Sequence, residues 1–289
     1  MTAGSYLAAI WRSRYFWLNL VGADLRARWR RSTLGIFWTL LQPIGFALLL
    51  TFVLGVGAGV GSGDSLPFVL SGLLVWDLIT ASITGGAVGG APRPYGLPGL
   101  WVGVLLPASP PGGPVAFLQA DAYIRQHRQP LAIYTLRASL GPLAHMATAS
   151  PVLLGAALLT LPQNFGWSWL ALPLIFPLAL LTVWPLATLV AFPTVRFRDI
   201  AHGLGLLLQA AWFLSPIYFL PDFFRQGGLD WLVDCNPLYH LLQIVRAPLL
   251  LGQWPTVTNL AVCGLTIVVL WALAALVVWR SEDRVIRYL

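Results

Sequence analysis

The sequence predicts an all-α integral membrane protein with about six transmembrane helices. Of its 289 residues, 58% are hydrophobic and only 9% are charged, whereas ordinary globular chains carry about 25% charged residues. Apolar runs of roughly 20 residues, the length of a helix that crosses a bilayer, recur along the chain. All 17 basic residues are arginines, and most lie between these runs, where they act as topology signals.

Residues 1–32 are predicted to form a cytoplasmic interfacial segment. They mix aromatic and basic residues without a long apolar run, and Trp11, Trp17 and Trp29 are costly to leave in water. This composition is typical of an amphipathic helix in the headgroup region, with its arginines toward anionic lipid. The alternative is a disordered basic tail. Because the segment is rich in Arg and Trp, no cleavable signal peptide is expected before the first span.

Residues 33–289 are predicted to form one six-span transmembrane domain. The spans fall at about 34–56, 66–86, 137–161, 168–192, 204–220 and 257–279. The fifth is short, and either tilts or continues into the following segment. With the N-terminus inside, only Arg225 and Arg246 of the 17 arginines fall in outer segments. This bias predicts that both termini are cytoplasmic.

The outer segment before the last span, at about 221–255, is predicted to fold as a short re-entrant helical hairpin. Its second part places Leu241, Leu242, Val245 and Leu249 near helical spacing. An amphipathic pattern of this kind favours a hairpin that dips back into the outer leaflet over an open loop.

A Pro/Gly-rich stretch at about 87–115 interrupts the domain on the cytoplasmic side. Its central part, 92–114, reads "PRPYGLPGLWVGVLLPASPPGGP" and cannot form a regular helix. It is either a genuine insertion or a short out-of-frame translation between two in-frame halves. Resequencing the locus separates these alternatives.

Several kinds of chemistry are excluded or unsupported. A phosphate-binding P-loop requires a lysine, and the chain has none. No metal site is expected, because the four histidines lie far apart in sequence and Asp199 with His202 lacks a third ligand. No G-x-S-x-G elbow is present. The net charge of +7 is spread along the whole chain, so no nucleic acid partner is expected, and the chain is not predicted to be an enzyme.

Two ionisable residues fall within predicted spans, Asp77 in the second and His145 in the third. Such residues tend to face the interior of a helical bundle, because a charge at the bilayer centre costs roughly 2.5–3.5 kcal/mol. Asp77 lies about 16 Å from the outer end and His145 about 12 Å from the inner end at 1.5 Å per residue. The two could therefore pair, or each could bond a backbone carbonyl or water alone.

Four stretches in order resemble one family of membrane proteins. They are "LRARWRRSTLGIFWTLLQPI" at 25–44, "AFLQADAYIRQHRQPLAIYTLR" at 116–137, "VRFRDIAHGLG" at 195–205 with "FLSPIYFLP" at 213–221, and "NPLYHLLQIVRAPLL" at 236–250. The family is that of the type-2 ABC transporter permease subunits that export bacterial polysaccharides such as O-antigen, capsule or teichoic acid chains. The likeness covers most of the chain, and only 87–115 departs from it.

The resemblance implies a homodimer in the inner membrane, bound to two copies of a separate ATPase subunit that carries ATP and Mg. No cofactor is then expected in this chain. It also implies that an N-terminal helix and two short cytoplasmic segments contact the ATPase. The matching positions are Arg28, Arg30, Arg31, Tyr123, Arg125, Arg128, Arg196, Arg198 and Asp199. Positive-inside bias alone would explain Arg196 and Arg198 but not Asp199, because acids contribute little to that rule.

A polysaccharide presents hydroxyls and apolar C–H faces, so an aromatic-lined path would hold it weakly. The candidates for this path are Trp38, Phe46, Trp76, Asp77, Trp212, Phe213 and Tyr218. Each aromatic residue could instead belong to a lipid-facing belt. Two other functions remain open at this point. An ion-driven carrier would use intramembrane charges such as Asp77 and His145, and a membrane-bound glycan or lipid transferase would need clustered acids or a metal.

Overall fold

A computed structural model describes residues 3–30, 37–58, 65–84, 116–117, 120–126, 129–197, 200–217 and 219–288, and all regular structure in them is helical. The first half comprises α1 (Ala3–Arg12), α2 (Arg14–Arg30), α3 (Phe37–Ala58), α4 (Ser65–Ile83), α6 (Asp121–Gln126) and α7 (Ala132–Thr160). Two 3-10 helices, η2 (Pro162–Asn164) and η3 (Trp167–Leu174), lead into α8 (Ile175–Arg196) and α9 (Ile200–Leu214). The chain ends with α10 (Pro221–Gln226), α11 (Asp230–Asp234), α12 (Pro237–Leu250) and α13 (Val257–Tyr288). The all-α prediction is confirmed.

Six helices coincide with the six predicted spans: α3, α4, α7, α8, α9 and α13. Within the described residues, four stretches are long and apolar enough to cross a membrane, namely Ser65–Ile83, Ala132–Thr160, Trp167–Arg196 and Val257–Glu282. The fifth predicted span is short, as expected, with an apolar part at Gly203–Leu214. α3 has 22 residues, about 33 Å at 1.5 Å per residue.

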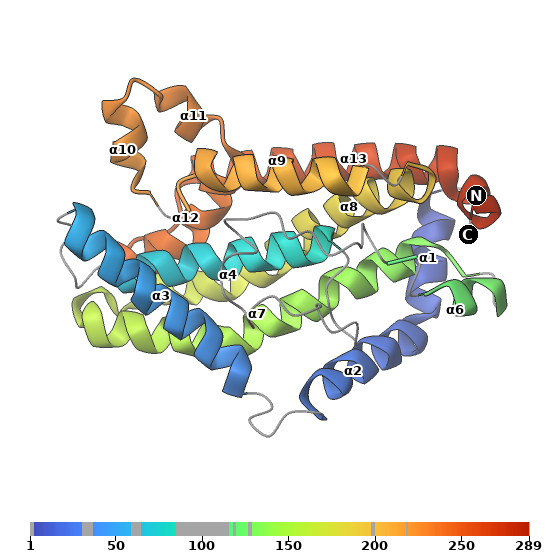
Figure 1. Cartoon of the computed structure of the whole chain (residues 1–289), viewed down its shortest axis with the longest axis horizontal. Coiled ribbons are helices and arrows are strands. Elements are labelled where there is room, and N and C mark those ends of the chain that lie inside the picture. Colours follow the sequence, from blue (N-terminus) through green and yellow to red (C-terminus); the bar gives the residue numbers. More distant parts are fainter. Residues whose placement is uncertain are drawn as a thin grey trace.

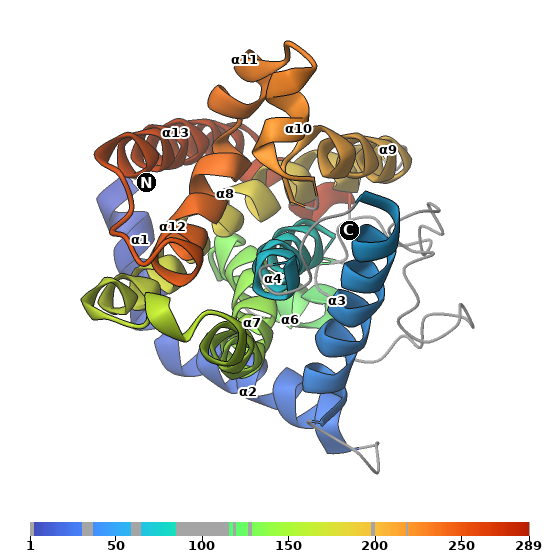
Figure 2. The same cartoon turned by 90° about the vertical axis from the view of Figure 1, so that its left-hand side faces the viewer.

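The long helices run roughly along one axis, and α4 lies at the centre of the bundle (Figures 1 and 2). Helices α3, α7, α8 and α12 pack around α4. Both chain termini lie at one end, here called the terminal end, together with α1 and α6 (Figure 1). Helices α10, α11 and α12 lie at the opposite end, the hairpin end. Both termini therefore lie on the same side of the bundle.

Polar and aromatic side chains join α7 to α8 and α8 to α13. The hydroxyls of Thr135 on α7 and Thr188 on α8 lie 2.8 Å apart in the buried interface. Trp184 on α8 and Trp271 on α13 meet edge to face with ring centroids 4.9 Å apart. Both α7 and α8 contain two internal prolines, which packed transmembrane helices tolerate because neighbouring groups satisfy the freed carbonyls.

The predicted interfacial segment is helical rather than a disordered tail, since α1 and α2 occupy almost all of it. The segment before the last span also contains helices, as predicted. Leu241, Leu242, Val245 and Leu249 of α12 are all buried, which confirms the amphipathic pattern as a packing face. The Pro/Gly-rich stretch at about 87–115 lies outside the described residues.

Candidate functional site

Arg246 on α12 forms a polar centre at the hairpin end, although its side chain is only 2% exposed. Helix α12 begins at Pro237, where Asn236 accepts a hydrogen bond from the Leu238 amide and caps the helix. The buried leucines of α12 face the bundle, so one turn further on the guanidinium also points inward. Among the described residues no carboxylate pairs with it, and its partners are neutral oxygens.

The Arg246 guanidinium joins three elements through four hydrogen bonds. Its Nη1 donates to the carbonyl of Pro216 at 2.5 Å and its Nη2 to that of Ile217 at 2.7 Å, just beyond the end of α9. On α4, its Nη2 donates to the carbonyl of Phe68 and its Nε to Ser71 Oγ, both at 3.2 Å. Both carbonyls follow the last residue of α9, Leu214, and so lie outside its intrahelical hydrogen bonds; Arg246 supplies their donors.

Gly72 makes this close approach possible. A Cβ atom at this position would overlap the carbonyl oxygen of Ile217 and lie 2.8 Å from Nη2 of Arg246. The absent side chain therefore lets the segment after α9 and the guanidinium rest directly on α4. We call Arg246, Gly72 and the Pro216 and Ile217 carbonyls the arginine junction.

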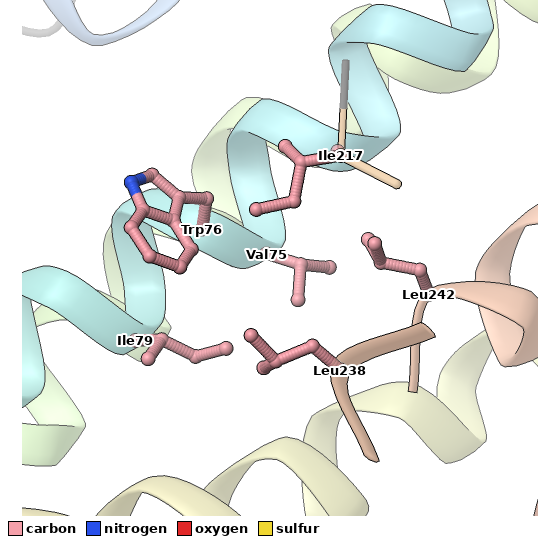
Figure 3. A pocket seen from close by; sticks show the side chains of 7 residues that line it. Val75, Trp76, Ile79, Ile217, Leu238 and Leu242 are labelled. Atoms are coloured by element: carbon pink, nitrogen blue, oxygen red, sulfur yellow. The ribbon is translucent and has the colours of Figure 1, made fainter. Parts of the chain in front are cut away.

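A narrow apolar cleft borders the arginine junction. Val75, Trp76 and Ile79 of α4 face Ile217 and the α12 residues Leu238 and Leu242 across it (Figure 3). The Trp76 ring also packs against that of Trp212 on α9, with centroids 5.5 Å apart. Helix α12 and the end of α9 thus contact the same face of α4.

The residues predicted to line a translocation path divide into two groups. Phe46, Trp76 and Trp212 are buried in the core of the single chain, at 8%, 6% and 6% exposure, so they could contact a passing molecule only if the helices part. Asp77 and Phe213 are exposed. The side chain of Trp38 and the whole of Tyr218 lie outside the described part of the chain.

The alternative that Asp77 pairs with His145 is wrong. Both residues are described, and no ion pair or hydrogen bond joins their side chains; Nδ1 of His145 is buried without a partner. Asp77 is the one exposed residue of α4 and faces away from the helices that bury the rest of α4. The positions of Asp77 and His145 along their predicted spans put them at similar depths in the bilayer. Depth alone does not indicate which way a side chain faces.

At the terminal end a small apolar cluster brings together the start of α2, helix α6 and the end of α8. Ile124 of α6 and Phe192 of α8 are buried in it, with Phe16 of α2 and Val195 of α8 packed against it. Tyr123 of α6 is 40% exposed, and its ring lies 6.1 Å from that of Phe16. Three segments far apart in sequence therefore present one continuous surface at this end.

Of the predicted coupling residues, Tyr123 and Arg196 lie at that surface, whereas Arg28 and Arg30 lie at the opposite end of α2 from Phe16. Arg196 ends α8, is exposed, and its guanidinium lies 5.0 Å from the Phe197 ring centroid. Arg28 and Arg30 lie in α2 and Arg125 lies in α6, but their side chains are outside the described part of the structure. Arg31, Arg128, Arg198 and Asp199 also lie outside it.

An ion pair that sequence reasoning missed fixes α2 on α7. Nε and Nη2 of Arg137 each donate to one oxygen of the Asp24 carboxylate, both at 2.6 Å. The two side chains are only 17% and 13% exposed, so water competes weakly for this bidentate pair. Nearby, the Ser13 hydroxyl donates to the side-chain oxygen of Gln129 at 2.7 Å.

The Asp24–Arg137 pair predicts a measurable coupling energy. We expect Asp24→Asn and Arg137→Gln each to destabilise the protein by about 2 kcal/mol, because each leaves a poorly solvated charge unpaired. The double variant should lose clearly less than the sum of the two. A double-mutant cycle on the thermal unfolding of the purified protein measures this, and strictly additive losses would contradict the pair.

Tyr6, Glu282 and the first turn of α7 form a second polar contact at the terminal end, here called the terminal clasp. The Tyr6 hydroxyl donates to Oε1 of Glu282 at 2.7 Å. The same carboxylate oxygen accepts from the Leu131 amide at 3.2 Å, and the Tyr6 oxygen accepts from the Ala132 amide at 3.3 Å. Burial, followed by the hydrogen bond and charge of Glu282, raises the pKa of Tyr6 far above its usual value. Tyr6 therefore stays a donor at physiological pH.

The described residues contain no group of three or more His, Cys, Asp or Glu side chains that could hold a metal ion. The site consists of structural contacts. The arginine junction lies toward one end of the bundle on α4, and the terminal clasp lies at the other end, beside an exposed surface formed by several segments. One feature of the sequence distinguishes a clasp residue: Glu282 is the single glutamate among the 10 acidic residues.

Comparisons with known proteins identify the family of this chain. The sequence profile of the ABC-2 type transporter family matches residues 15–250. The O-antigen export system permease protein RfbA of Myxococcus xanthus is 23% identical over 95% of each chain. The protein of the same name from Klebsiella pneumoniae is 18% identical over 77% of this chain and 75% of its own. Because the profile covers most of the sequence, the chain belongs to the ABC-2 type transporter family.

Proposed function

We propose that this chain is the membrane-spanning permease subunit of an ATP-driven exporter that moves polysaccharide or lipid-linked glycan across the bacterial inner membrane. The observation that carries the proposal is the match to the transporter family over residues 15–250, together with a relative named as an O-antigen export system permease that aligns along 95% of the chain. ATP and Mg would bind a separate ATPase subunit, since the chain has no lysine for a P-loop.

The surface at the terminal end supports contact with that ATPase. It combines α2, α6 and the end of α8, and it carries Tyr123 and Arg196 in exposed positions. The arginine distribution favours a cytoplasmic location for this end and for both termini. Nucleotide binding by the partner would then push on this surface and shift the permease between closed and open states, provided that the partner binds the two states differently.

Exposed apolar faces support a multi-pass protein with six spans that forms a homodimer. Large apolar side chains are exposed along α3, α9 and α13, among them Phe52, Leu206, Leu207, Leu265 and Val268. Some of these faces would contact lipid and others a second copy of the chain. An exposed carboxylate within a span is costly in lipid, so Asp77 favours a face of α4 turned toward a water-filled path between the copies.

The N-terminal helices supply a surface for membrane lipid. Leu7 and Trp11 are exposed four residues apart on one side of α1, and Tyr15 and Leu18 are exposed three residues apart on one side of α2. The Arg14 guanidinium lies 4.9 Å from the Tyr15 ring centroid, at the edge of this side. Aromatic rings beside arginines suit the headgroup region of an anionic leaflet.

A copurification experiment tests the proposed function. The tagged chain is purified in mild detergent from its native membranes, and copurifying proteins and ATP hydrolysis are measured. We expect an ATPase in equal amount and hydrolysis, both strongly reduced by Arg196→Glu and unaffected by Arg225→Glu at the hairpin end. A folded chain that purifies alone, without hydrolysis, would overturn the proposal and favour an ion-coupled carrier. The unpaired Asp77 and His145 give that alternative little support.

A further inference from the structure

The terminal clasp joins three parts of the chain that are remote in sequence. Tyr6 lies in α1, Glu282 in the last helix, and the Leu131 and Ala132 amides at the start of α7. The contacts span sequence separations of 276, 151 and 126 residues. A single carboxylate oxygen accepts from two of these parts, so a movement of α1, α7 or α13 alone would break at least one hydrogen bond.

The clasp replaces a cap that α7 does not supply for itself. The residue before α7, Leu131, has no side chain that can accept from the free amides of the first turn. Glu282 and Tyr6 bind two amides there from outside the helix. A carboxylate at a helix N-terminus is also favoured by the positive end of the helix dipole. The hydrogen bonds and the dipole therefore bind Glu282 to this end of α7.

The clasp lies directly behind the surface proposed to contact the ATPase. Helix α6 ends at Gln126, five residues before Leu131, and Ile124 of α6 shares its apolar cluster with Leu131 and with Val285 of α13. The cluster and the clasp thus hold α6, the start of α7 and the end of α13 in one body. The Asp24–Arg137 pair adds α2 to the same body.

We propose that Tyr6 and Glu282 are positioning residues that couple the ATPase-facing surface to α7 and α13, so that a push on α6 moves both chain ends and both spans together. This inference rests on the proposed function. Its distinctive consequence is a loss of export per ATP hydrolysed, because loosened helices would respond to the push separately while the ATPase keeps its docking surface.

The test uses the full complex with its ATPase in the native host. Tyr6→Phe removes the hydroxyl alone, and Glu282→Gln removes the charge but keeps an acceptor oxygen. Tyr134→Phe is the matched control, because the buried Tyr134 hydroxyl near the start of α7 has no hydrogen-bond partner in the described structure. Surface polysaccharide is extracted and quantified by carbohydrate staining on gels. Assembled complex is quantified by copurification, and ATP hydrolysis is measured on the purified complex.

We expect Tyr6→Phe to reduce export per ATP hydrolysed by at least about fivefold, because its hydroxyl makes two hydrogen bonds in the clasp and the loss of one changes an equilibrium by about that factor. Glu282→Gln should reduce it by a smaller factor, because the amide loses the charge but keeps an acceptor oxygen. The double variant should lose less than the two single effects combined, since both side chains take part in the same hydrogen bond. Export per ATP equal to that of Tyr134→Phe would overturn the inference. So would a loss of export that only follows a loss of assembled complex. If the unaltered chain yields neither a bound ATPase nor export, the proposed function itself fails.

Discussion

Replacement of Arg246 by methionine is expected to destabilise the protein by about 2–6 kcal/mol, because the Pro216 and Ile217 carbonyls each lose their donor at about 1–3 kcal/mol. Methionine fills much of the space of the arginine stem but offers no N–H group. The expected result is a marked fall in the midpoint of heat-induced aggregation of the detergent-purified protein. The midpoint of Arg246→Lys should lie between those of the unaltered protein and Arg246→Met, because one ammonium group cannot reproduce the fork of guanidinium donors.

Arg225→Met is the matched control for this change. Arg225 also lies at the hairpin end, but its side chain is 45% exposed and its contacts with Asp230 and Asp234 are 4.0 and 3.6 Å. Exposed pairs of this kind contribute little, so its loss should change stability by less than about 1 kcal/mol. Equal effects of the two methionine variants would contradict the role assigned to the arginine junction.

Gly72→Ala is expected to destabilise the protein by about 1–3 kcal/mol, a large effect for one added methyl group. The new Cβ would overlap the Ile217 carbonyl and crowd Nη2 of Arg246, so the segment after α9 would have to move off α4. Thermal unfolding measures the loss. In the Arg246→Met background the cost should shrink, because the segment is then already released from α4.

A second glycine supplies the control for Gly72. Gly155 lies within α7, and a Cβ atom there meets nothing within 4 Å. Gly155→Ala should therefore leave stability unchanged or raise it by up to about 1 kcal/mol, because alanine is the better helix former. A comparable loss at both positions would show that the cost at Gly72 does not arise from its contact with Ile217.

The helices of this fold could be predicted from the sequence because their determinants are local. Long apolar runs located α4, α7, α8 and α13 to within several residues, and the spacing of leucines between Leu241 and Leu249 located α12. The short apolar run after His202 likewise predicted a shorter fifth helix. A run of apolar residues predicts such a helix regardless of where the rest of the chain lies.

The polar contacts could not be predicted, because they depend on which way each helix faces. Arg246 was counted as one of two outer arginines, yet it is buried against α4. Asp77 and His145 were considered as a pair from their depths, but Asp77 faces away from the packed side of α4. Periodicity gives the rotation of a helix only when one of its faces is polar, and α4 is apolar nearly all round.

The terminal clasp also sets an order of events in biogenesis. The first turn of α7 emerges from the ribosome long before Glu282, which lies 151 residues later in the chain. During synthesis those amides must therefore bond to water, and the start of α7 lacks its contact with Glu282 until translation is almost complete. The closing contact can form only once the last helix is inserted. A chain truncated before residue 282 would insert its spans but leave this end open, in a form that quality-control proteases recognise more readily than the finished protein.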